Sequence, residues 1–175
     1  DCVFSGTKGN YTETDRHDPL DVYGKTKSLG EVKSENFMNL RTSILGPETS
    51  GHTSLYDWVR LQPPNAEING FLDHIWNGIT TKAFARVARG IIENGTFEAG
   101  VQHVTPSDQV PKASLISAIA AGLGRIDIKI NPINTSTAVD RSLKTNNQGI
   151  NQKLWTDAGY PEVPSISELL AEIVN

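Results

Sequence analysis

The sequence has a single cysteine, Cys2, and therefore cannot form an internal disulfide bond. It has no apolar run approaching the roughly 18 residues that a membrane-spanning helix needs. Positive charge is not in excess either, since 16 Lys and Arg against 20 Asp and Glu leave a net charge of −4. That balance does not support a bulk attraction to nucleic acid or to an anionic membrane. We therefore expect a protein of a reducing compartment, the cytoplasm, that binds neither nucleic acid nor membranes.

The 175 residues are close to the usual size of one domain. A compact chain of this length buries roughly 68–70% of its unfolded surface, so a core can form without disulfides or metal ions. The sequence also lacks an initiator methionine and a basic leader, and its first residues, Asp1 to Phe4, are typical of the end of a strand. We therefore expect the chain to be part of a longer polypeptide.

Hydrophobic periodicity predicts strands that alternate with helices, the pattern of an α/β protein. The clearest strand signal is the alternation of Ile126, Ile128 and Ile130 with charged residues. Asp21 is the expected N-cap of the first helix, and Gly95 the expected end of the third. Helices are predicted over 21–37, 54–61, 81–94, 111–123, 151–158 and 165–174, and strands over 38–45, 67–72, 100–105 and 126–130.

Tyr23 and Lys27 carry the chemistry that the sequence suggests. Four residues apart on a helix, both side chains lie on one face, one turn apart. An ordinary phenol has a pKa near 10 and is a poor acid–base catalyst at neutral pH. A nearby ammonium stabilises the phenolate and lowers the pKa of a phenol. Taken alone, the spacing fits a solvated helix face as well as a catalytic pair.

Three segments around this pair occur in a specific order. Residues 1–6 read DCVFSG, residues 19–31 read PLDVYGKTKSLGE, and residues 40–43 read LRTS. In this order and spacing they resemble the extended short-chain dehydrogenase/reductases, and most closely the dTDP-4-dehydrorhamnose reductase branch. Weaker similarity continues through residues 76–87 and 140–143, so the resemblance spans most of the chain.

The resemblance implies a role for five residues. Tyr23 would be the general acid that protonates the C4 oxygen of a keto sugar. Lys27 would hold the nicotinamide ribose and favour the phenolate form of Tyr23. Val3, Phe4 and Ser43 would lie near the sugar. The implied reaction is the reduction of a nucleotide-linked 4-keto-6-deoxy sugar by NADPH or NADH, with no metal ion, and the resemblance also suggests a homodimer.

The chain departs from the family pattern in three ways. No glycine-rich dinucleotide fingerprint lies between a strand and a helix. The third catalytic residue of the family, a Ser or Thr, would stand immediately before Asp1. Ile44 takes the place of an aromatic residue that often follows the LRTS segment.

We therefore expect the C-terminal portion of a larger enzyme. The predicted fold is α/β, the C-terminal part of a Rossmann-like doubly wound sheet plus a small α/β substrate-binding lobe. Residues 1–50 would belong to the nucleotide-binding domain with the Tyr–Lys helix. Residues 51–110 would cross between the sheet and the lobe, and residues 111–175 would form mainly the substrate-binding lobe.

Two other functions fit the same residues. A nucleotide-sugar epimerase or dehydratase of this superfamily also uses a tyrosine and a lysine. A non-catalytic binding protein is the second alternative, because the regulatory subunit of methionine adenosyltransferase resembles the same reductases. Retention of both Tyr23 and Lys27 favours catalysis.

The missing glycine fingerprint gives a first prediction. Residues 1–175 by themselves should neither bind NAD(P)H tightly nor turn over, because the phosphate cradle is absent from them. Titration of these residues with NADPH, followed by the fluorescence of the cofactor, tests this. A dissociation constant in the low micromolar range would show that the prediction is wrong.

Overall fold

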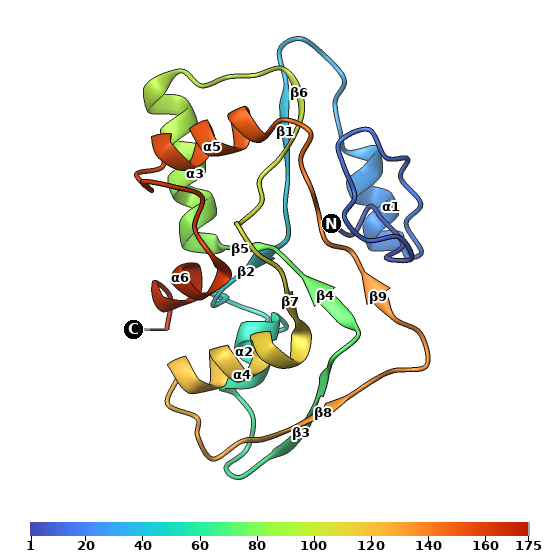
Figure 1. Cartoon of the computed structure of the whole chain (residues 1–175), viewed down its shortest axis with the longest axis vertical. Coiled ribbons are helices and arrows are strands. Elements are labelled where there is room, and N and C mark those ends of the chain that lie inside the picture. Colours follow the sequence, from blue (N-terminus) through green and yellow to red (C-terminus); the bar gives the residue numbers. More distant parts are fainter. Residues whose placement is uncertain (175) are drawn as a thin grey trace.

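A computed structural model describes residues 1–174 of the chain (Figure 1). The helices are α1 (Val22–Leu29), α2 (Leu55–Arg60), α3 (Thr81–Asn94), α4 (Lys112–Gly122), α5 (Gln148–Asp157) and α6 (Ile166–Ala171). The strands are β1 (Met38–Arg41), β2 (Ile44–Leu45), β3 (Glu67–Phe71), β4 (His74–Trp76), β5 (Ile79–Thr80), β6 (Gly100–His103), β7 (Val110–Pro111), β8 (Lys129–Ile133) and β9 (Val139–Asp140).

Strand pairing is mostly parallel. β1 pairs with β6, β2 with β5, β3 with β8 and β4 with β9 in parallel, whereas β7 runs antiparallel to β4. Parallel pairs need a crossover connection, and helices supply several of them here. This arrangement confirms the predicted α/β class.

The molecule has two large apolar cores and a small third one, which consists of Val3, Phe4, Tyr11 and Leu143. In the upper half of Figure 1, α3 and α5 lie beside β1 and β6, and their upper core is centred on Val87, Leu154 and Trp155. In the lower half, α2 and α4 pack near β3 and β8 around a lower core that includes Val59 and Ile119. Residues 111–174 contribute to both cores, through α4 below and α5 above. The domain boundaries proposed from the sequence stay a prediction.

Local signals fixed the ends of several helices. α3 covers the predicted range and ends at Gly95, which has the left-handed φ of 66° that favours glycine. α1 starts after Asp21 as predicted, but it ends at Leu29 and does not continue to residue 37. Asn39 explains the early end, because its side-chain amide bonds both the N–H and the carbonyl of Val32. The backbone after α1 is thus held by a side chain of the next strand.

Two strand predictions were wrong in part. The segment 38–45 is not one strand but two, because its pairing partner changes. Residues 38–41 pair with β6, whereas residues 44–45 pair with β5, and the Ile79 N–H donates a hydrogen bond to the Ser43 carbonyl between them. Ile126 is not part of a half-buried strand and is 91% exposed. It lies in a turn closed by the ion pair between Arg125 and Asp127, and β8 starts only after that turn. Strands β4, β5, β7 and β9 are too short to give a periodic signal and were not predicted.

A buried carboxylate holds the loop that precedes α2. The side chain of Asp57 is fully buried, and its two oxygens accept hydrogen bonds from Arg60 Nε at 2.8 Å and from the Glu48 N–H at 3.0 Å. His52 Nδ1 lies 2.9 Å from the second oxygen. The hydrogen bonds from His52 and then Arg60 lower the pKa of Asp57 to about 2. The ionised carboxylate is therefore the form that the fold requires.

This network predicts a pH-dependent loss of stability. Because the pKa of Asp57 is lower in the folded chain than the ordinary 3.8, its contribution is complete above about pH 4 and is lost as the pH falls toward 2. We expect Asp57→Asn to lower the free energy of unfolding at pH 7, since an amide leaves one donor unmatched. The difference from the wild type should shrink between pH 4 and pH 2.

Urea unfolding at several pH values measures this. Glu98→Gln is the control, because Glu98 is exposed and has no ion pair among residues 1–174. A difference between wild type and Asp57→Asn that stays constant down to pH 2 would contradict the proposed role of the carboxylate.

Candidate active site

The segments singled out in the sequence meet at one cleft of about 750 Å³. Residues 1–3, the inner side of α1 and the chain from the end of β1 to Ile44 form its walls. Val3, Tyr23, Lys27 and Ser43 all line it. The structure thus brings together four of the five site residues predicted from the sequence.

Tyr23 and Lys27 form the polar centre of this cleft. The Lys27 Nζ lies 5.2 Å from the centroid of the Tyr23 ring, and Tyr23 is 62% exposed. No carboxylate lies within 4.0 Å of the Lys27 ammonium among residues 1–174. A phenol and an unpaired ammonium therefore face solvent side by side, which suits proton transfer to a ligand and binding of hydroxyl groups.

The position of α1 depends on two short-range features. Asp21 caps the helix by accepting a hydrogen bond from the Gly24 N–H at 2.7 Å. Gly24 itself is buried against the backbone of Cys2, and a Cβ at this position would overlap the Cys2 carbonyl oxygen and lie 2.8 Å from the Cβ of Pro19. The absent side chain is what lets α1, and Tyr23 with it, approach residues 1–3.

Ser43 and Phe4 occupy different surroundings. Ser43 lies at the cleft wall, where its hydroxyl oxygen accepts a hydrogen bond from Trp76 Nε1 at 2.8 Å. Phe4 does not line the cleft. It is fully buried and stacks on Tyr11 at 4.2 Å between ring centroids, with the Arg41 guanidinium 5.8 Å from its ring. A contact between Phe4 and a sugar stays a prediction, and in the described residues Phe4 packs behind the cleft.

Two cations next to the cleft were missed by the sequence analysis. A hollow of about 240 Å³ shares Ser43 and Ile44 with the main cleft and is also lined by Lys112 and Arg141. Neither cation has a carboxylate partner within 4.0 Å among residues 1–174. Burial first, and then the charge of Arg141, lower the pKa of the Lys112 ammonium.

Uncompensated positive charge at the wall of a hollow is the property expected of an anion site. The only sequence signal for it was the weak similarity over residues 140–143, which includes Arg141.

Other hollows carry less chemistry. A hollow of about 700 Å³ lies near residues 105–109 and 143–152. Its buried amides bond within the chain, Asn77 to the backbone of Leu143 and Asn151 to that of Thr105. Within residues 1–174 no group of three or more His, Cys, Asp or Glu could hold a metal ion, and no helix is long and apolar enough to cross a membrane.

The fold and this site define a class of protein. The strands pair mostly in parallel, and a tyrosine and a lysine lie one turn apart on a helix that faces a cleft. This is the arrangement of an extended short-chain dehydrogenase/reductase. The chain belongs to the family described as RmlD substrate binding domain, whose sequence model matches residues 1–175. This confirms the resemblance that the three sequence segments indicated.

Curated relatives include a reductase and a subunit of another enzyme. Methionine adenosyltransferase 2 subunit beta of Rattus norvegicus is 30% identical over 170 residues, which cover 89% of this chain and 50% of that protein. The dTDP-4-dehydrorhamnose reductase of Aggregatibacter actinomycetemcomitans is 36% identical over 115 residues, 60% of this chain and 38% of that protein. The chain thus spans about half the length, or less, of the curated relatives it matches.

Solved structures show the same fold. A dTDP-4-dehydrorhamnose reductase from Yersinia enterocolitica superposes with a TM-score of 0.75 at 18% identity, over 99% of this chain and 63% of that one. One from Clostridium acetobutylicum gives 0.70 at 23% identity, over 99% and 62%. At these identities the likeness establishes the fold, and it confirms the predicted Rossmann-like relationship.

The close approach at Gly24 predicts a sensitive position. Gly24→Ala should destabilise the protein by about 1–3 kcal/mol, the usual cost of forcing a methyl group into a packed site. Chemical denaturation at pH 7 measures the change. Gly149→Ala is the matched control, because Gly149 is helical and a Cβ there meets nothing within 4 Å. Equal stability of the two variants would contradict the close packing of α1 on Cys2.

Proposed function

We propose that this chain carries the acid–base and substrate-binding part of an NAD(P)H-dependent reductase that acts on a nucleotide-linked 4-keto-6-deoxy sugar. The observation that carries the proposal is the cleft in which the unpaired Lys27 ammonium lies 5.2 Å from the Tyr23 ring centroid. The 36% sequence identity to a dTDP-4-dehydrorhamnose reductase over 115 residues supports the same chemistry.

The residues present fit one end of a nicotinamide cofactor. Lys27 is exposed, lacks a carboxylate partner in the described residues and can donate to ribose hydroxyls. The phosphate end would need a glycine-rich turn that this sequence does not contain. When bound, the cofactor supplies a hydride to C4 of the keto sugar.

Tyr23 completes the reaction with a proton. Its hydroxyl donates that proton to the C4 oxygen, so that the carbonyl becomes an alcohol and the tyrosine becomes a phenolate. The positive charge of Lys27 stabilises the phenolate. Solvent then returns the proton to Tyr23, which is exposed enough to exchange with water.

Lys112 and Arg141 suit the diphosphate of a nucleotide sugar. Both line a hollow that adjoins the cleft, and neither is neutralised by a carboxylate in residues 1–174. One structural relative, 18% identical, is described as a complex with UDP-glucose and NAD, which supports a nucleotide-sugar substrate.

In this proposal residues 1–50 belong to the nucleotide-binding domain, 51–110 cross to the lobe, and 111–175 form mainly the substrate lobe.

Substitution of the catalytic pair tests the proposal. In the natural full-length protein, Tyr23→Phe should lower kcat for NAD(P)H oxidation with a dTDP-4-keto-6-deoxy sugar by about 10²–10⁴-fold, the usual contribution of general acid catalysis. Lys27→Met should lower kcat and also raise KM for the cofactor. The initial rate of NAD(P)H absorbance loss, measured over a range of cofactor concentrations at saturating sugar, gives both constants.

Lys25→Met is the matched control for the lysine variant. Lys25 lies on the same helix, is exposed and has no ion pair among residues 1–174. Its replacement should leave kcat and KM unchanged. Full activity of Tyr23→Phe would contradict the reductase proposal.

The match to methionine adenosyltransferase 2 subunit beta favours a second candidate function. That protein is named as a subunit, and the chain is 30% identical to it over 89% of its own length. A regulatory or binding module on this fold would use the cleft, or another surface, without turnover. Such a protein would show no keto-sugar reduction and would be indifferent to Tyr23→Phe. An epimerase or dehydratase, the remaining alternative, would depend on Tyr23 but would not consume NAD(P)H.

A further inference from the structure

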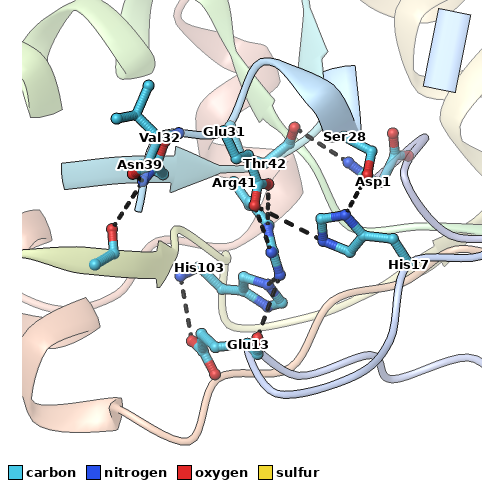
Figure 2. A network of polar contacts seen from close by, with 11 residues as sticks. Asp1, Glu13, His17, Ser28, Glu31, Val32, Asn39, Arg41, Thr42 and His103 are labelled. Atoms are coloured by element: carbon cyan, nitrogen blue, oxygen red, sulfur yellow. Dashed lines mark hydrogen bonds and ion pairs between the residues drawn. The ribbon is translucent and has the colours of Figure 1, made fainter. Parts of the chain in front are cut away.

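A nearly buried ion pair forms the wall behind the tyrosine and the lysine. Arg41, on β1, donates from Nε to Glu31 Oε1 at 2.6 Å and from Nη2 to Glu31 Oε2 at 2.8 Å, so both carboxylate oxygens are engaged (Figure 2). The side chains of Arg41 and Glu31 are only 9% and 13% exposed. Both residues also line the cleft that contains Tyr23 and Lys27.

Groups from three segments, the loop before α1, α1 itself and β6, surround this pair. A hydrogen bond of 2.7 Å joins His17 Nδ1 to the Ser28 hydroxyl. The other ring nitrogen of His17, Nε2, lies 3.8 Å from Glu31 Oε2. Arg41 Nη1 also donates to the Glu13 carbonyl at 3.4 Å and lies 3.4 Å from His103 Nε2 (Figure 2). These partners hold the guanidinium in a single orientation.

The His103 ring is neutral and can therefore lie against the Arg41 guanidinium. Its Nδ1 lies 3.0 Å from the Lys144 carbonyl oxygen and must donate there, which leaves Nε2 as an acceptor for Arg41. Burial, partly opposed by the charge of Glu13, lowers the pKa of His103. For Glu31, burial acts to raise the pKa, but the hydrogen bonds and charge of Arg41 prevail and hold it below its usual range.

Lys27 stands in the position of a competing partner for Glu31. Glu31 lies beyond the end of α1, but Gly30 between them has a φ of −78° and a ψ of −5°, still in the right-handed helical region. Glu31 therefore follows Lys27 by about one helical turn, the spacing at which opposite charges can pair. Lys27 nevertheless has no carboxylate within 4.0 Å in the described residues, and its Nζ lies over the Tyr23 ring. Both oxygens of Glu31 are instead occupied by the two-pronged contact with Arg41.

We propose that Arg41 is a positioning residue that holds the Glu31 carboxylate away from Lys27 and so keeps the ammonium beside Tyr23. This inference rests on the proposed function for its catalytic meaning. Its structural claim is only that Arg41 keeps Glu31 from pairing with Lys27, and this claim can be tested without measuring enzyme activity.

The test measures the reactivity of the Lys27 amine in the natural full-length protein. Trace acetylation with acetic anhydride, read by peptide mass spectrometry, gives the labelling of Lys27 relative to Lys25 on the same helix. In Arg41→Gln the released Glu31 should pair with Lys27 and lower that ratio by about two- to fivefold, the factor expected of a partly exposed ion pair. In Glu31→Gln no carboxylate is available, and the ratio should not fall.

The opposite signs separate positioning from simple structural support. If the ion pair only anchored α1, both single variants would loosen the helix and change Lys27 labelling in the same direction, which would overturn the proposal. The double variant Glu31→Gln/Arg41→Gln should return the ratio to that of Glu31→Gln. A double variant that stays as low as Arg41→Gln would also overturn it.

Arg41→Lys covers the case in which Arg41→Gln does not fold. A lysine keeps the charge but contacts one carboxylate oxygen, so a smaller fall in Lys27 labelling is expected, and an unchanged ratio overturns the proposal. Full activity of Tyr23→Phe would remove the proposed function while leaving these labelling results standing. The two failures are therefore distinguishable.

Discussion

The ion pair between Arg41 and Glu31 is the contact on which the geometry of the cleft depends. α1 has only eight residues and would be marginal as an isolated helix, so tertiary contacts must fix it. The Asp21 cap and the close approach of Gly24 fix its start, and the ion pair fixes the chain just beyond its end. A nearly buried ion pair is stable only when its remaining hydrogen-bonding capacity is satisfied, and His103 and neighbouring loop residues provide those partners.

The distribution of paired and unpaired cations separates structural from functional charge. Arg41, Arg60 and Arg125 each hold a carboxylate and fix a turn or a helix end. Lys27 and Arg141, by contrast, line hollows and have no carboxylate within 4.0 Å in residues 1–174. Cations left without partners beside a cleft are the groups available to a ligand. In the proposed function, Lys27 would bind ribose hydroxyls of the cofactor, and Arg141 would bind the diphosphate of the nucleotide sugar.

Local signals in the sequence predicted the local structure well. The Asp21 cap, the Gly95 stop and the Tyr23–Lys27 spacing each act within one or two helical turns, and all three appear as expected. Long-range placement was less accessible. Ile126 alternates correctly for a strand yet lies in a turn, because the ion pair between its two neighbours decides the backbone there.

The same distinction applies to the site. Segments that carry a recognisable motif identified Val3, Tyr23, Lys27 and Ser43, which line one cleft. The sequence analysis did not single out Lys112. Its proposed role as an anion ligand depends on Arg141, 29 residues later in the sequence, and on the lack of a nearby carboxylate. No periodicity or spacing reports that kind of proximity. Phe4 carries the motif but stacks on Tyr11, since a short loop folds back over it.

The most direct test of the catalytic proposal follows the hydride itself. The natural full-length protein is incubated with a dTDP-4-keto-6-deoxy sugar and NAD(P)H deuterated at the transferring C4 position, and the sugar product is analysed by mass spectrometry. A reductase built on Tyr23 and Lys27 transfers one deuterium to C4 of the sugar. A product without deuterium, or no product at all, would contradict the reductase function and favour an epimerase, a dehydratase or a binding subunit.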